Sequence, residues 1–114
     1  MQVGEIQLRY FKEKLREAVY SMAVGPGDVR SRLLTASSDL VAIKESDIPS
    51  ELRGRWEKFH AGLTKYGPVK DGRGETAVGA IEHTLQRIKN STGVGLAVCL
   101  YELLSELENL EERQ

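Results

Sequence analysis

Few side chains of this sequence have the chemistry to act on a substrate or to hold a metal ion. The chain has two histidines, His60 and His83, and one cysteine, Cys99. Metal sites need several ligands that converge, and these three residues show none of the short spacings that zinc sites use. Cys99 stands among apolar neighbours, which favours a thiol that fills core space. We therefore expect no metal ion, no cofactor and no catalytic cysteine.

Arg55 and His60 come closest to a catalytic pair. They stand five positions apart in the segment Arg-Trp-Glu-Lys-Phe-His. Over these six residues the chain resembles the HEPN family of small all-helical ribonucleases, in which an Arg is followed a few residues later by a His. The resemblance implies that Arg55 and His60 would polarise a phosphodiester and move its proton across a dimer interface. In that family the residue after Arg is usually polar, whereas here it is Trp56, so a ribonuclease is the alternative hypothesis.

A glycine-rich turn offers a different kind of candidate site. Gly25-Pro26-Gly27 is followed by Asp28, Arg30 and Arg32. Free amides at a helix start, together with two guanidinium groups, are able to hold an anion. Asp28 would place a negative charge where that anion would sit, so we expect a capped turn between two helices instead. The remaining Gly-x-Gly triplets complete no phosphate-binding motif.

Composition limits the class of protein. The chain has 114 residues, of which 40% are hydrophobic and 29% charged, with 16 basic against 17 acidic side chains. These values exclude collagen, a disulfide scaffold, a multi-domain enzyme and an overall basic nucleic-acid binder. The longest uncharged run in the C-terminal half, 90–101, is too short and too polar to span a bilayer. We expect one cytoplasmic domain over residues 1–114, with 111–114 frayed and no membrane contact.

Apolar residues recur at steps of three and four in the first half of the chain, which predicts helices. The first helix is predicted from Glu5 to Ala23. The second begins after the N-cap Asp28, and we expect it to end early, near Ala36, because the segment 37–39 favours local backbone bonds. The third begins near Pro49, and we expect Trp56 to anchor its buried face. That face consists of Leu52, Trp56, Phe59, Leu63 and Tyr66.

The second half of the chain is predicted to contain a flexible loop over 69–74 and a fourth helix over 75–89. The apolar stripe of this helix is out of phase with the leucines that follow, so we expect a break over 90–95; one kinked helix over 75–112 is an alternative. No stretch alternates polar and apolar residues long enough to predict a sheet. The fold class is therefore all-α, a compact bundle of four to five helices with short connections.

The C-terminal helix carries a leucine stripe that runs almost to its end. We expect its last part to extend past shorter neighbours, so that a second copy of the chain covers the exposed leucines. If the first helix covers the whole stripe, no second copy is needed. The interaction candidates are Leu100, Leu103, Leu107 and Leu110.

Charge is unevenly distributed along the sequence. Residues 52–90 carry 8 basic and 4 acidic side chains, and residues 91–114 carry 1 and 5. The acids of the last helix either pack beside the basic third helix or face a second chain. The basic region 53–73 is a candidate for weak nucleic-acid binding, although the neutral total charge argues against it. Its cations are Arg53, Arg55, Lys58, Lys65, Lys70 and Arg73.

Taken together, the residues favour a small, non-enzymatic interaction or regulatory protein that acts through helix packing. We expect it to form a homodimer or to bind a helix of a partner protein. The alternatives are a HEPN-like ribonuclease and a weak nucleic-acid binder. This preference rests mainly on the lack of polar side chains whose spacing would bring them together.

Overall fold

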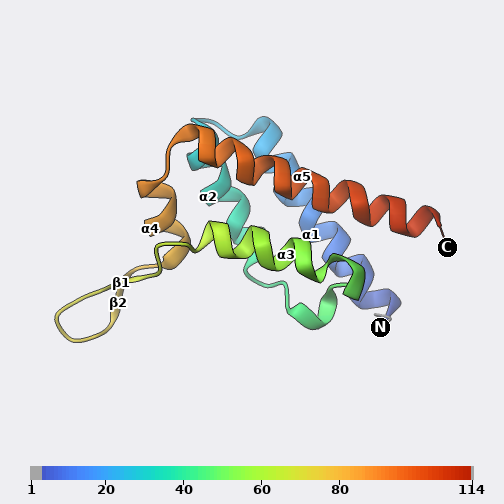
Figure 1. The fold of residues 1–114 in the computed structure, drawn as a ribbon, viewed down its shortest axis with the longest axis horizontal. Coiled ribbons are helices and arrows are strands. Elements are labelled where there is room, and N and C mark those ends of the chain that lie inside the picture. Colours follow the sequence, from blue (N-terminus) through green and yellow to red (C-terminus); the bar gives the residue numbers. More distant parts are fainter. Residues whose placement is uncertain (1–3, 114) are drawn as a thin grey trace.

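Five α-helices make up most of the chain, which a computed structural model describes over residues 4–113 (Figure 1). The predicted all-α bundle is confirmed. A short 3-10 helix precedes α3, and a two-stranded hairpin precedes α4. The elements are α1 (Glu5–Val24), α2 (Val29–Leu40), η1 (Glu45–Asp47), α3 (Ser50–Leu63), β1 (Val69–Lys70), β2 (Thr76–Val78), α4 (Ala80–Arg87) and α5 (Asn90–Glu112).

The turn between α1 and α2 is a capped turn, as the sequence predicts. Gly27 has a φ of 86°, a conformation that glycine adopts without strain. The Asp28 carboxylate accepts a hydrogen bond from the backbone N–H of Ser31 at 3.0 Å and pairs with Arg30 at 3.0 Å. These two interactions lower the pKa of Asp28. The Arg32 guanidinium donates to backbone carbonyls of the turn and of α1, so both arginines hold the turn itself.

Helix α2 continues to Leu40, and the predicted early end near Ala36 is wrong. The hydroxyl of Ser37 donates to the carbonyl of Leu34 at 2.6 Å, and that of Ser38 donates to Thr35 at 2.8 Å. Both hydroxyls therefore bond inside the helix instead of drawing the backbone out of it. Burial of Leu40 against the core stabilises the last turn.

The segment 69–78 forms a hairpin where a loop and a helix start were predicted. Val69 pairs with Val78 and Lys70 with Thr76 in antiparallel register. The Asp71 carboxylate accepts from the backbone N–H groups of Arg73 and Glu75, and it thereby orders the turn. With 75–78 in the hairpin, α4 starts at Ala80. Strands of two and three residues are too short to leave an alternating pattern in the sequence.

The break before the last helix lies at Ile88 and Lys89, and its predicted position over 90–95 is wrong. Both residues have extended backbone with ψ of 159°, and α5 begins at Asn90. The Arg30 side chain donates to the Ile88 carbonyl at 3.1 Å and ties this break to α2. The glycines that suggested a break lie inside α5. A Cβ atom on Gly93 would come within 2.9 Å of a methyl group of Val29, so glycine here permits close packing of α2 on α5.

Helix α5 is packed on α1, α2 and α3 and contributes the largest share of the core (Figure 1). Its acids pair with α1, since Glu108 lies 3.4 Å from Arg16 and Glu111 lies 2.6 Å from Lys12. The expected packing of these acids beside the basic third helix is therefore replaced by pairing with the first helix. Of the segment expected to fray, 111–112 belongs to α5, and Gln114 lies outside the described residues.

The two glycines near the start of α5 give a matched stability test. We expect Gly93→Ala to lower the free energy of unfolding by about 1 kcal/mol or more, because its Cβ collides with Val29. A Cβ atom on Gly95 meets nothing within 4 Å, so Gly95→Ala is expected to raise it by about 0.5–1 kcal/mol through helix propensity. Urea unfolding of both variants measures the difference. Equal effects of the two substitutions would contradict the close contact between α2 and α5.

Asp39 gives a pH-dependent test of the contact between α1 and α2. Partial burial and the neighbouring Glu17 raise the pKa of Asp39, while Lys14 opposes the shift. A carboxyl group whose pKa is raised by folding favours the folded state below its ordinary value of 3.8, and this contribution is lost as pH rises through the raised pKa. We therefore expect Asp39→Asn to raise the melting temperature at pH 7 and to change it little at pH 3. Glu13→Gln, at an exposed position of α1, is the control. A stabilisation by Asp39→Asn that is the same at both pH values would contradict the prediction.

Candidate functional site

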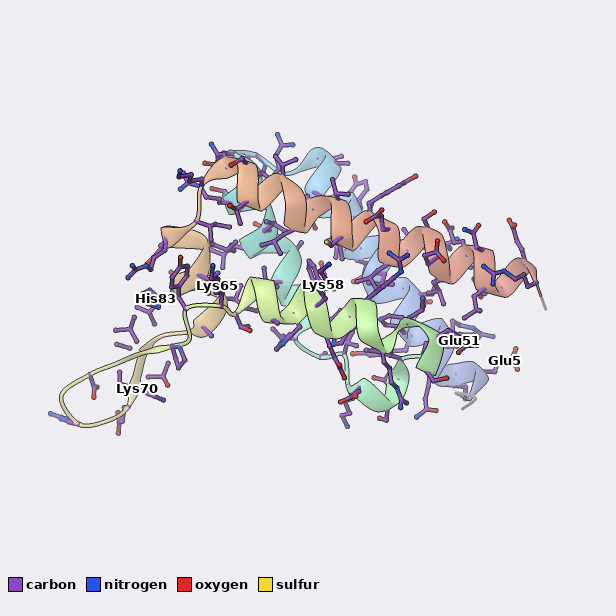
Figure 2. The ribbon with its side chains drawn as sticks, in the orientation of Figure 1. Glu5, Glu51, Lys58, Lys65, Lys70 and His83 are labelled. Atoms are coloured by element: carbon purple, nitrogen blue, oxygen red, sulfur yellow. The ribbon has the colours of Figure 1, made fainter. Side chains whose placement is uncertain are left out.

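The basic region 53–73 does not form one patch. Lys58 lies midway along α3, Lys65 beyond the end of α3, and Lys70 on the hairpin (Figure 2). Lys70 donates to the hydroxyl of Thr76 at 2.7 Å across the hairpin, and Arg53 donates to the carbonyl of Ile48. Arg53 and Lys70 therefore stabilise local structure, and the region is divided between α3, the turn after it and the hairpin.

Arg55 and His60 lie on different faces of α3. Positions five residues apart in an α-helix are turned by about 140° from each other. The His60 ring stacks on the ring of Trp56, with centroids 6.2 Å apart, and lines a groove in which Arg55 takes no part. Within one chain the two side chains do not converge on a substrate.

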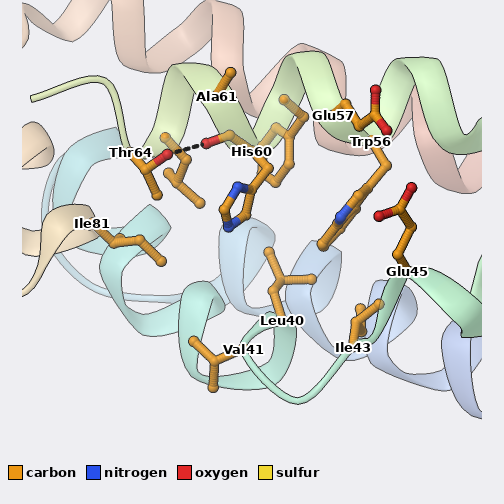
Figure 3. A pocket seen from close by; sticks show the side chains of 12 residues that line it. Leu40, Val41, Ile43, Glu45, Trp56, Glu57, His60, Ala61, Thr64 and Ile81 are labelled. Carbon is orange, nitrogen blue, oxygen red and sulfur yellow. Dashed lines mark hydrogen bonds between the residues drawn. The ribbon is translucent and has the colours of Figure 1, made fainter. Parts of the chain in front are cut away.

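The groove beside His60 lies between α3, the end of α2 and η1 (Figure 3). It has a volume of about 510 Å³, and its base is the apolar core, including Leu40 and Phe59. Trp56 is 8% exposed and packs edge-on against Phe11, which confirms its predicted burial. The polar lining of the groove consists of His60, Thr64 and the exposed carboxylates of Glu45 and Glu57.

The remaining candidates for metal or covalent chemistry are separated. The His83 ring is hydrogen-bonded to the carbonyl of Gly67 at 2.9 Å, and Cys99 is half-buried at the edge of the core. Over residues 4–113, no group of three or more His, Cys, Asp or Glu side chains is close enough to hold a metal ion.

The predicted interaction leucines are placed differently from the expectation. Leu100 and Leu107 are fully buried, Leu103 is 1% exposed and Leu110 is half-buried. They are covered by the chain's own helices because α1 has 20 residues and follows α5 as far as Glu111. This is the arrangement in which the first helix covers most of the stripe, and Leu110 is the member of the stripe that keeps the most exposed surface.

The opposite side of α5 carries an exposed apolar strip that is not among the predicted interaction leucines. Val94, Val98 and Tyr101 are 53%, 49% and 61% exposed. Their spacing of four and three places them on one side of the helix, away from the buried leucines. We call these three residues the α5 outer strip. The sequence signal for it is the absence of charge from 90 to 101, a run that is apolar on more than one face.

The end of α1 also carries exposed apolar side chains. The ion pair between Arg16 and Glu108 fixes an antiparallel arrangement of α1 and α5. Tyr20 lies one turn beyond Arg16 on α1, and Tyr101 lies two turns before Glu108 on α5. Tyr20 and the following Val24 are 67% and 59% exposed. Figure 1 shows α1 crossing behind α5 in this part of the molecule.

Comparison with known protein families, with curated proteins and with solved structures finds no match to this chain. Within the part of the chain that the structure describes, none of the helices combines the length and apolar character needed to cross a membrane.

The separation of Arg55 from His60 predicts how the purified chain behaves toward RNA. We expect single-stranded RNA to stay intact during incubation, because Arg55 and His60 lie on different faces of α3 and Trp56 between them is buried. Gel electrophoresis of the RNA checks this. Cleavage that disappears in both Arg55→Ala and His60→Ala would instead establish the ribonuclease.

Proposed function

We propose that this chain is a cytoplasmic, non-enzymatic interaction protein that acts through helix packing and pairs with a second copy of itself through the α5 outer strip. The observation that carries the proposal is the first half of α5. This segment has no charged side chain, and it has apolar residues both on its buried side and on its exposed side.

A helix that is apolar on opposite faces is stable in water when both faces are covered. In this chain the inner face, with Leu96 and Leu100, packs on the core. The outer strip is left open to solvent. In the proposed contact, the exposed Tyr20 and Val24 at the end of α1 extend it. An additional helix laid along the strip would bury these side chains and gain the free energy of removing them from water.

A second copy of α5 fits the strip in shape and charge. The spacing of Val94, Val98 and Tyr101 is that of a seam between two helices. In a two-fold arrangement the same strip meets itself, and because it holds no charge, no like charges are brought together. The acids Glu108 and Glu111, which would repel their copies, are already paired with α1.

Sedimentation equilibrium tests the self-pairing. At concentrations up to about 100 µM, above the dissociation constant of most weak dimers, we expect the mass of a dimer for the unmodified chain. Val98→Glu is expected to give a monomer, because it places a charge at the centre of the two-fold contact. We expect the Val98→Glu variant to show the thermal unfolding transition of a folded chain, since Val98 is half exposed in the monomer.

Ile6→Glu is the matched control. Ile6 is 81% exposed and lies at the start of α1, far along the chain from the residues that extend the strip, so the dimer should persist. A monomeric unmodified chain would refute the self-pairing. A dimer that survives Val98→Glu would place the contact on another face.

A further inference from the structure

A second groove lies on the other flank of α5, where the ends of α3 and α4 meet the first turns of α5. It has a volume of about 660 Å³, which is within the range of sites for small ligands. Its lining combines a cationic rim with an apolar and glycine floor. The lining residues are Gly62, Lys65, Tyr66, Arg87, Ile88, Lys89, Thr92, Gly95, Leu96 and Cys99.

The rim carries three positive charges and no negative one. Lys65, Arg87 and Lys89 line the groove, and no Asp or Glu does. None of these three cations takes part in the ion pairs of the described residues. Lys12, Arg16 and other cations of α1, in contrast, are each paired with a carboxylate. Three like charges around one concave surface attract an anion more strongly than the same charges spread over a flat one.

Two of these cations are held in place by an aromatic ring. The Arg87 guanidinium lies 4.7 Å from the centre of the Tyr66 ring, and the Lys65 ammonium lies 5.6 Å from it. The backbone of Tyr66 is held in place, because its N–H donates to the buried hydroxyl of Thr84 at 3.0 Å. The contact with the ring favours positions of Arg87 and Lys65 beside the groove, and any such ordering lowers the entropy lost on binding.

Open space lies above Gly95, next to apolar side chains of the lining. A Cβ atom on Gly95 would meet nothing within 4 Å, so the groove is open above this residue. Leu96 and Ile88, both largely buried, form the apolar part of the lining. The hydroxyl of Thr92 adds a polar group near the rim.

We propose that this groove binds a small anion that joins a phosphate group to an aromatic ring, as a nucleotide does. Lys65, Arg87 and Lys89 hold the phosphate oxygens by charge-assisted hydrogen bonds. The aromatic ring lies over Gly95 and Leu96. The groove is separate from the α5 outer strip, so the proposal stands or fails independently of self-pairing.

Isothermal titration with ATP tests the proposal. We expect one ATP per chain. Arg87→Gln and Lys65→Gln are each expected to weaken ATP binding about tenfold, the loss that removal of one hydrogen bond between charged groups produces. Lys58→Gln and Lys70→Gln remove the same charge outside the groove and should leave the affinity unchanged.

Gly95→Leu tests the floor without changing charge. The leucine fills the open space above Gly95, so it should weaken ATP binding and leave the weaker binding of inorganic phosphate unaltered. Circular dichroism verifies that each variant is folded.

Four outcomes would overturn the proposal. They are no binding of ATP, equal losses in the groove and control variants, binding of adenosine as tight as that of ATP, and tighter binding of single-stranded RNA that the control lysines share. The last would assign these cations to a nucleic-acid surface.

Discussion

The close approach of α2 to α5 is the constraint on which the rest of the structure depends. It requires a residue without a side chain at Gly93, where a Cβ atom would collide with Val29. One residue further along α2, Arg30 reaches the Ile88 carbonyl and ties the α4–α5 break to the same point. With its start held there, α5 crosses the bundle in a fixed direction. Its leucines then fill the space between α1 and α3.

The position of α5 also decides which surfaces remain for binding. Its inner side is taken by the core, including Leu100, Leu103 and Leu107. Its outer side leaves Val94, Val98 and Tyr101 in contact with water. A third flank borders the groove beside Gly95. One uncharged half-helix thus supplies the core, the proposed contact between copies and the floor of the proposed anion site.

Electrostatics separate the two ends of this helix. Two of the acids in its second half, Glu111 and Glu108, pair with Lys12 and Arg16 of α1, and this pairing aligns the two longest helices. Lys65, Arg87 and Lys89 lie around the start of α5, and they take part in none of the ion pairs of residues 4–113. The unequal charge of the two parts of the sequence therefore corresponds to acids that pair with α1 and to cations that line a groove without an ion pair.

The sequence by itself determined the fold class, the bounds of α1, the capped turn at Asp28 and the burial of Trp56. Each of these follows from helical periodicity or from bonds between residues a few positions apart, and such signals are local. Only the tertiary structure decided the end of α2, the hairpin and the place of the break before α5. Gly93 shows the reason: a glycine in a helix weakens it locally, but here it is required by a methyl group of Val29, which is 64 positions away in the chain. Likewise, the exposure of Val98 and the gathering of Lys65, Arg87 and Lys89 depend on which helix covers which face, and periodicity alone does not specify the neighbour.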